Sequence, residues 1–368
     1  MKQKKLWIII AIIVVAVIAT FFALRPAPQS TDPHPVVKIG ATLPLSGNFG
    51  DIGYSAKVAL SAAVRDANEN SNNKFYYELL MENDEMNSSK TMTIVSKFTE
   101  YDKVSAIVSI FSMSGRVIAP VATKDKIVHI NCGYADKNIL SSKYNFANFS
   151  PLDSQSAALF EFLKTNGIKK VSFLFSNVGA SQEILDRLIP LLQKNGIAFD
   201  SQRFNPGERD FQQAVNKIKL DNSGALLVYA FEPEADIIAK EVIKQKLDKK
   251  ISFIDSSMMS RNLELFDGTY NIGSPRMSEE FNKRVGLGSS NGYIAGYMYD
   301  IGTVIVKAIE ESAADNSKIP TGDEIADTIL NMKDFSGVVG DYTITSNGQF
   351  YSPIKIYLIK DGEYIETK

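Results

Sequence analysis

The chain has 368 residues, of which 45% are hydrophobic and 22% are charged, and its formal net charge is −2. This composition is typical of a globular protein, and the length favours two domains. The charge excludes the basic surplus with which proteins bind nucleic-acid phosphates, so no nucleic-acid partner is expected. The single cysteine, Cys132, excludes an intramolecular disulfide. With only two histidines, His34 and His129, the chain is a poor source of a zinc site or a Cys–His nucleophile.

The N-terminus carries three lysines within the first five residues, followed by an almost wholly apolar run, Leu6–Leu24. This run predicts either a membrane-spanning signal anchor or a cleaved signal peptide over residues 1–24. In both cases the lysines stay in the cytoplasm and the rest of the chain lies outside it. No cysteine follows closely, so a lipid-bearing cysteine is not expected. Residues 25–35 contain four prolines and predict an extended tether.

From residue 36 onward, short apolar strands alternate with amphipathic helices. The first series has predicted strands at Val36–Thr42, Phe75–Met81, Val104–Ile110 and Ile127–Ile130 and helices at Ser55–Glu69, Ser89–Thr99 and Gly115–Thr123. The second has strands at Val171–Phe175, Ile197–Phe204, Ala225–Phe231 and Ile251–Asp255 and helices at Ser181–Lys194, Asp210–Leu220 and Glu234–Lys244. Two helices and a β region follow, at Tyr293–Ser312, Asp323–Met332 and Gly337–Leu358. Repeated βαβ units predict an α/β fold with two Rossmann-like lobes built on parallel sheets.

Open parallel sheets bind ligands at the carboxyl ends of their strands, so the loops at those ends are the candidate binding loops. The loop after the first strand, Ser46–Gly53, has glycines spaced G-x-x-G-x-x-G, which departs from the dinucleotide fingerprint. It predicts a tight cleft loop with Phe49 as an apolar wall. After the third strand, Ser112 and Ser114 stand at a helix N-terminus. They favour either binding of a carboxylate or simple helix capping.

Further candidate residues follow the remaining strands. Gly133, Tyr134 and Ala135 come after the fourth strand, where Tyr134 either contacts a ligand or packs within its loop. Val178 opens a helix in the second series. The remaining candidates are at strand ends: Phe231, Glu232 and Asp255. An acid there either pairs with a ligand ammonium group or serves as a solvated or capping side chain.

Catalytic patterns are absent from the sequence. It contains no G-x-S-x-G nucleophile elbow, and one of its two histidines lies in the tether. The sequence therefore predicts neither an enzyme nor a bound metal or cofactor.

Several segments resemble a known family. Val37–Gly47, followed by Gly53 and a helix that ends in Ala67-Asn68-Glu69, resembles the opening of type I periplasmic binding proteins, in particular the leucine/isoleucine/valine-binding branch. Segments that resemble later parts of the family follow in the same order, at Val104–Ser112, Pro206–Phe211, Gly296–Asp300, Phe335–Gly340 and Asn347-Gly348. The resemblance extends from about Val36 to the C-terminus.

The resemblance implies two lobes joined by three hinge crossings, near Ser150–Asp153, Asn271–Pro275 and Phe350–Pro353. Lobe 1 would comprise residues 36–151 and 276–350, and lobe 2 residues 152–275 and 351–368. It also implies an extracytoplasmic monomer that closes on a small ligand, an amino acid or related carboxylate, and delivers it to the permease and ATPase of an ABC importer. A ligand-sensing ectodomain with a separate signalling partner is the alternative.

The resemblance also assigns roles to individual residues. Phe49 falls where the family often has an aromatic residue against the ligand, and Ser112 and Ser114 fall in its carboxylate-binding region. The departures are at Ala135, which lacks a hydroxyl, at Val178, where an aromatic residue is common, and at Asp255, which aligns imperfectly with an ammonium-binding glutamate. These departures argue against an ordinary α-amino acid as the ligand.

Overall fold

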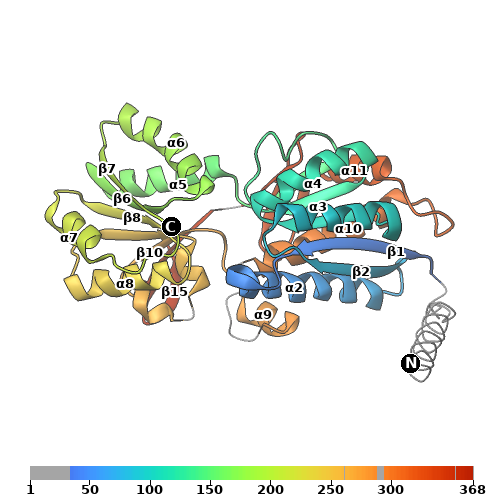
Figure 1. Cartoon of the computed structure of the whole chain (residues 1–368), viewed down its shortest axis with the longest axis horizontal. Coiled ribbons are helices and arrows are strands. Elements are labelled where there is room, and N and C mark those ends of the chain that lie inside the picture. The colour runs from blue at the N-terminus through green and yellow to red at the C-terminus, as the bar shows by residue number, and fades with distance from the viewer. Residues whose placement is uncertain (1–33, 261, 288–293, 353, 368) are drawn as a thin grey trace, which may run out of the picture.

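The computed structural model describes residues 34–260, 262–287, 294–352 and 354–367. They form two α/β lobes that lie side by side, each built on one sheet (Figure 1). Lobe 1 is the lobe whose sheet contains the first strand, and lobe 2 contains the other sheet. The α/β class expected from the sequence is confirmed.

Lobe 1 has an eight-stranded sheet in the order β11-β12-β13-β5-β4-β3-β1-β2. Its strands are β1 (Val36–Leu43), β2 (Tyr76–Asn83), β3 (Ala106–Ile110), β4 (Val128–Cys132), β5 (Asn145–Asn148), β11 (Asp334–Ser336), β12 (Asp341–Ile344) and β13 (Gln349–Tyr351). Its helices are α2 (Gly50–Glu69), α3 (Ser88–Lys97), α4 (Phe111–Asp125), α9 (Glu279–Val285), α10 (Ala295–Ser312) and α11 (Gly322–Met332).

Lobe 2 has a seven-stranded sheet in the order β15-β14-β10-β9-β8-β6-β7. Its strands are β6 (Lys170–Ser176), β7 (Ala198–Phe204), β8 (Ala225–Tyr229), β9 (Lys250–Ile254), β10 (Tyr270–Gly273), β14 (Lys355–Lys360) and β15 (Glu363–Glu366). Its helices are α5 (Leu152–Thr165), α6 (Gly179–Lys194), α7 (Gln212–Leu220) and α8 (Glu234–Gln245).

The cores of both lobes follow from their apolar strands. β3 and β8 are central strands that are buried at every position, because helices cover both faces of a parallel sheet. In lobe 1, α10 packs along α2. Gly302 permits this close approach, since a Cβ at that position would lie 2.7 Å from the Cβ of Ala63.

The expectation of parallel sheets is wrong at the C-terminal strands, and both sheets are mixed. β11–β12 and β12–β13 pair antiparallel in lobe 1, and β10–β14 and β14–β15 pair antiparallel in lobe 2. Short turns join β11 to β12, β12 to β13 and β14 to β15, and such turns can connect only antiparallel neighbours.

Two elements near the first crossing were not expected from the sequence. β5 contains two asparagines, which are depleted in strands, although Asn145 satisfies its amide by donating to the carbonyl oxygen of Ala119. α5 follows it directly. A third difference matters for the site: α4 begins at Phe111 and not at Gly115, so Ser112 lies in its first turn.

The chain passes between the lobes three times: from β5 to α5, from β10 to α9 and from β13 to β14. Within the ranges that the structure describes, no helix is both long and apolar enough to cross a membrane. The targeting segment predicted for residues 1–24 lies outside those ranges, as does most of the tether.

Candidate ligand-binding site

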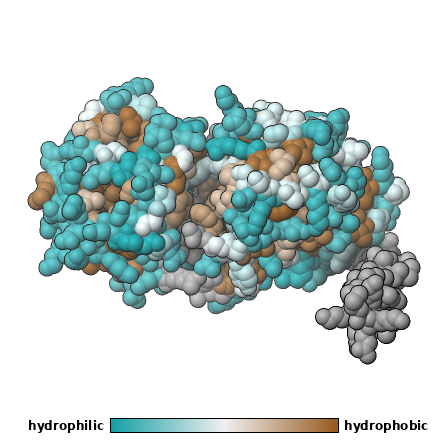
Figure 2. Space-filling model, in the orientation of Figure 1, coloured by the Kyte–Doolittle hydropathy of each residue, from teal (hydrophilic) through white to brown (hydrophobic). Residues whose placement is uncertain are grey.

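A cavity of about 260 Å³ lies between the two lobes. Most of its lining residues lie at or after the carboxyl ends of strands in both sheets, where open parallel sheets bind ligands. They are Phe49, Ile52, Met86, Phe111, Ser112, Arg116, Cys132, Gly133, Tyr134, Phe149 and Ile294 from lobe 1, and Val178, Gly179, Ala180, Glu183, Tyr229 and Phe231 from lobe 2. Figure 2 shows apolar surface along the boundary between the lobes and a more hydrophilic surface over most of the rest of this face.

Aromatic rings form much of the cavity wall. The rings of Phe49 and Phe111 meet edge to face with their centroids 5.2 Å apart, and those of Tyr229 and Phe231 are 5.5 Å apart. Phe111 adopts a left-handed backbone conformation with φ of 68°, which is strained for a bulky residue. That conformation turns the chain directly from β3 into α4. Strained residues of this kind cluster at ligand-binding sites.

Three helices begin at this cavity. α2 starts at Gly50, α4 at Phe111 and α6 at Gly179, and each contributes residues of its first turn, or of the position just before it, to the lining. The first backbone N–H groups of a helix have no partner within the helix, and they carry a partial positive charge. Their convergence on one cavity favours an anion there.

The two serines of α4 have different roles. The Ser112 hydroxyl lines the cavity and donates a hydrogen bond of 2.7 Å to the carbonyl oxygen of Tyr134. The Ser114 hydroxyl is fully buried and donates to Oδ2 of Asp84 at 2.8 Å. Ser114 therefore fixes the first turn of α4 to the segment after β2, and Ser112 joins that turn to the loop after β4.

A chain of alternating charges, which we call the rim ladder, crosses from lobe 1 to lobe 2 at the cavity. Nε and Nη2 of Arg116 each lie 2.8 Å from Oδ2 of Asp136, and Nη2 lies 3.8 Å from Oε1 of Glu183. Arg187 continues the ladder, 3.8 Å from Glu183 and 2.8 Å from Asp153. Although burial acts in the opposite direction, hydrogen bonds from Arg116 and the backbone hold the pKa of Asp136 below its usual value.

Two tyrosines, Tyr134 of lobe 1 and Tyr229 of lobe 2, both line the cavity and lie near each other. Burial raises the pKa of both, and the nearby charge of Asp255 adds to this. Both hydroxyls therefore keep their protons at neutral pH and are available to a ligand as neutral hydrogen-bonding groups. No group of three potential metal-ligating side chains occurs within the described ranges.

The sequence matches the periplasmic binding protein family over residues 36–363. The chain belongs to this family. This confirms the resemblance to type I periplasmic binding proteins. No curated protein matches the sequence significantly.

Solved structures of periplasmic binding proteins share the fold. The branched-chain amino acid binding protein LivJ of Streptococcus pneumoniae, in complex with isoleucine, has a TM-score of 0.77 at 18% identity, covering 90% of this chain and 100% of that one. A solute-binding protein of Rhodopseudomonas palustris in complex with 3,4-dihydroxybenzoic acid has a TM-score of 0.78 at 19% identity, with coverage of 90% and 96%. Another from R. palustris, in complex with benzoate, has a TM-score of 0.76 at 14% identity, with coverage of 90% and 95%.

In this periplasmic binding protein, six of the ten residues predicted to bind a ligand line the cavity. They are Phe49, Ser112, Gly133, Tyr134, Val178 and Phe231. Their contact with a ligand stays a prediction.

The other four predicted residues do not line the cavity. Ser114 lies behind it against Asp84, and Glu232 is exposed. Ala135 lines a separate hollow of about 330 Å³ beside the first crossing. Asp255 is buried, and its left-handed backbone directs Oδ1 to the amide of Ser274 at 2.7 Å, so the acid expected to meet a ligand ammonium group is held at the second crossing.

Two charged residues of the cavity lining, Arg116 and Glu183, were not predicted from the sequence. Each lies four residues after a cavity residue, Ser112 and Gly179 respectively, and therefore on the same face of its helix. That spacing could have identified both. Phe149 was missed because the strand before it was not predicted.

Proposed function

We propose that this protein is an extracytoplasmic solute-binding protein that captures a small carboxylate with an apolar body between its lobes and presents it to an ABC importer. The observation that carries this proposal is the cavity itself, where three helix N-termini meet a wall of aromatic rings. The N-termini suit the carboxylate, and the rings suit a flat apolar body.

The structural neighbours support this class of ligand. Their bound molecules are isoleucine, 3,4-dihydroxybenzoic acid and benzoate, each of which has a carboxylate and an apolar part. Among these, we favour a carboxylate without an ammonium group. Glu183 is the acid in the cavity lining, and it is already close to two arginines, Arg116 and Arg187. Asp255 is held at the second crossing.

A thermal-shift screen with benzoate, 4-hydroxybenzoate, isoleucine and benzamide tests the proposal. A ligand at a hundred times its Kd stabilises the folded state by about 2.7 kcal/mol, so a tight ligand raises the Tm measurably. We expect a benzoate to raise the Tm and benzamide, which has no carboxylate, to have little effect. A shift with isoleucine alone would assign an amino acid to the cavity, and no shift with any carboxylate would contradict the proposal.

Substitutions in the cavity wall should weaken binding of the carboxylate found in that screen. We expect Phe49→Ala to raise the Kd about tenfold, because it removes one apolar wall. Ser112→Ala should raise the Kd about fivefold through the loss of one hydrogen bond. Isothermal titration calorimetry measures both changes. Tyr101→Ala is the matched control, since Tyr101 is an exposed aromatic residue of lobe 1 outside the cavity. Unchanged affinity in both cavity variants would show that the ligand binds elsewhere.

The rim ladder gives a separate prediction. Arg116 lines the cavity, so Arg116→Met should raise the Kd for a carboxylate about tenfold by removing a charge-assisted contact. Arg187→Met is the control, because Arg187 belongs to the same ladder but not to the cavity lining. An equal loss of affinity in the two variants would mean that the ladder acts through the arrangement of the lobes, without contact between Arg116 and the ligand.

A further inference from the structure

One buried tyrosine lies where the three crossings between the lobes come together. Tyr297 is on α10 of lobe 1 and is fully buried. Each crossing carries one buried serine: Ser150 follows β5, Ser274 follows β10 and Ser352 follows β13. These segments are far apart in the sequence, and the same tyrosine hydroxyl is next to all three serines.

The first and third crossings are hydrogen-bonded to this hydroxyl and to each other. The Tyr297 hydroxyl lies 3.0 Å from Oγ of Ser150 and 3.3 Å from Oγ of Ser352. The two serine hydroxyls are themselves 3.0 Å apart. The three groups form a closed triangle of hydrogen bonds inside the protein, where an unmade bond is costly.

The second crossing is held differently. The backbone amide of Ser274 donates to Oδ1 of Asp255, which fixes the crossing to lobe 2. The Ser274 hydroxyl is buried beside the Tyr297 hydroxyl, but it makes no hydrogen bond of good geometry within the described part of the chain. The Ser274 hydroxyl of the second crossing therefore lies next to the triangle. It is placed to take over one of the triangle's hydrogen bonds when the crossings move.

The triangle is also connected to the cavity. Phe149 lines the cavity and immediately precedes Ser150. Its ring centroid is 5.0 Å from that of Tyr297 and 4.9 Å from that of Tyr134, which also lines the cavity. Phe149 at the cavity wall is thus in direct contact with Tyr297, whose hydroxyl joins the crossings.

We propose that Tyr297 is a positioning residue for lobe movement: its hydroxyl ties the first and third crossings together, beside the second, and sets the orientation of lobe 2 relative to lobe 1. Around this point the crossings can change direction without separating. Because the Tyr297 ring packs on Phe149, occupation of the cavity and the lobe orientation are coupled through the same residue.

Distances between the lobes test this proposal in the absence of any ligand, and so independently of the proposed function. Spin labels at Lys124→Cys in lobe 1 and Lys194→Cys in lobe 2, both exposed positions, report the lobe-to-lobe distance by double electron–electron resonance. The native Cys132 is buried, so labelling is directed to the introduced cysteines. In Tyr297→Phe we expect the population outside the wild-type distance peak to rise about five- to thirtyfold, the factor that corresponds to the loss of two ordinary hydrogen bonds.

Tyr77→Phe is the matched control. Tyr77 is also buried in lobe 1, on the edge strand β2, and donates to Oε1 of Glu310 at 2.7 Å. Both variants should lower the Tm, but only Tyr297→Phe should broaden the distances. A cooperatively melting Tyr297→Phe protein with the wild-type distance distribution overturns the proposal, and so does equal broadening in Tyr77→Phe.

A second set of variants keeps the tyrosine and removes its partners. Ser150→Ala and Ser352→Ala should each broaden the distribution less than Tyr297→Phe does. The double serine variant should reproduce Tyr297→Phe, because groups of one network are not additive. Wild-type distances in the double serine variant would also overturn the proposal.

Discussion

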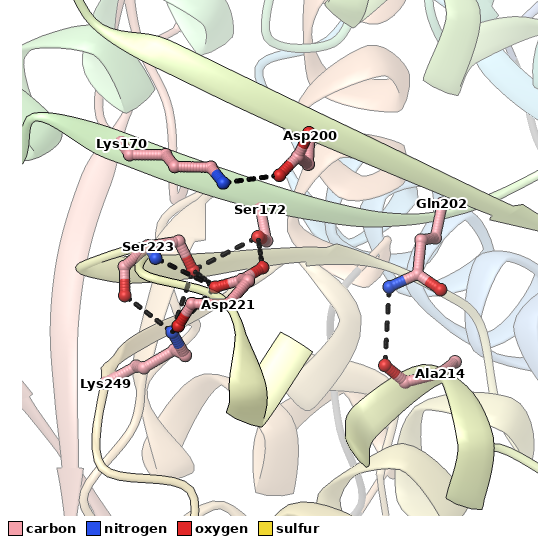
Figure 3. A network of polar contacts seen from close by, with 8 residues as sticks. All are labelled: Lys170, Ser172, Asp200, Gln202, Ala214, Asp221, Ser223 and Lys249. Atoms are coloured by element: carbon pink, nitrogen blue, oxygen red, sulfur yellow. Dashed lines mark hydrogen bonds and ion pairs between the residues drawn. The ribbon is translucent and has the colours of Figure 1, made fainter. Parts of the chain in front are cut away.

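Lys249→Met should lower the free energy of unfolding by about 3–5 kcal/mol, the cost of leaving a buried charge without its partner. Only 7% of the Lys249 side chain is exposed. Its Nζ donates to Oδ1 of Asp221 at 2.9 Å, to the Asp221 carbonyl at 3.1 Å, and to Oγ and the carbonyl oxygen of Ser223 at 3.0 and 2.6 Å (Figure 3). Methionine fills a similar volume but leaves four acceptors without this donor.

The network around Lys249 explains the size of the effect. Asp221 also accepts from the hydroxyls of Ser172 on β6 and Ser223 before β8, so the lysine joins the amino ends of three strands of lobe 2 (Figure 3). Although burial acts in the opposite direction, hydrogen bonds from these serines and Lys249 hold the pKa of Asp221 below its usual value. Its contribution to stability is therefore present above about pH 4 and is lost as the pH falls below that.

Urea unfolding of Lys249→Met and of Lys97→Met measures the prediction. Lys97 pairs with Glu82 at 2.6 Å, but half of its side chain is exposed, so its loss should cost far less than the loss of Lys249. Carboxylate binding should survive in Lys249→Met whenever the protein is folded. The network lies at the amino ends of the strands, whereas the cavity lies at their carboxyl ends. Equal costs in the two variants would refute the importance of burial at Lys249.

The second large effect concerns acid. His129 is completely buried in lobe 1, with Nε2 2.8 Å from Oγ of Ser109 and Nδ1 3.1 Å from Oδ1 of Asn145. Burial lowers its pKa from 6.5 to about 4, against the effect of the Asn145 hydrogen bond. Between these two values the unfolded chain binds a proton that the folded chain does not. His129 should therefore destabilise the protein progressively as the pH falls from about 6.5 to 4, by about 3 kcal/mol in all.

Another buried group of lobe 1 acts in the opposite direction. Burial raises the pKa of Asp300 to about 6, against hydrogen bonds from Val338, Val339 and Tyr342. Over the interval between its ordinary pKa and about 6, the folded chain binds the proton more readily than the unfolded chain. Stability contributed by Asp300 therefore rises as the pH falls through that interval. Because the two contributions change in opposite directions with pH, the pH dependence of the stability of the unmodified protein would not reveal either of them.

A comparison with His129→Gln separates the two. Glutamine does not titrate, so the stability difference between the unmodified protein and the variant should shift by roughly 2 kcal/mol in favour of the variant between pH 7 and pH 5. Urea unfolding at the two pH values measures this difference. Asp300→Asn should shift in the opposite direction. A difference for His129→Gln that is constant with pH would show that the buried ring is not held neutral.

The sequence predicted the repeated part of the fold better than the crossings. β3 and β8 were recognisable because a strand that is buried on both faces consists almost only of apolar residues. β5 was not, since Asn145 is compensated by hydrogen bonds to α4 and to a neighbouring loop that no local pattern reveals. Of the antiparallel pairs, β10–β14 joins segments far apart in the chain, and periodicity does not show such a pairing.

The candidate site shows the same division. Phe49, Ser112 and Phe231 could be placed because each lies at or after the end of a predicted strand, and the carboxyl ends of parallel strands meet at one edge of a sheet. Asp255 also follows a strand, yet its left-handed backbone turns the carboxylate toward Ser274. The triangle at Tyr297 could not be predicted from the sequence, because it requires the positions of α10 and of two crossings at once.

The route of the chain makes the two lobes unequal during synthesis. Most of lobe 2, from α5 to β10, is one continuous stretch of sequence, so its contacts are comparatively local and can form early. Lobe 1 is interrupted by that stretch: Gln349 of β13 binds the carbonyl oxygen of Ala147 at the end of β5, 202 residues earlier. The ribosome must therefore deliver nearly the whole chain before either lobe can complete its sheet, because lobe 1 waits for β13 and lobe 2 for the edge strands β14 and β15.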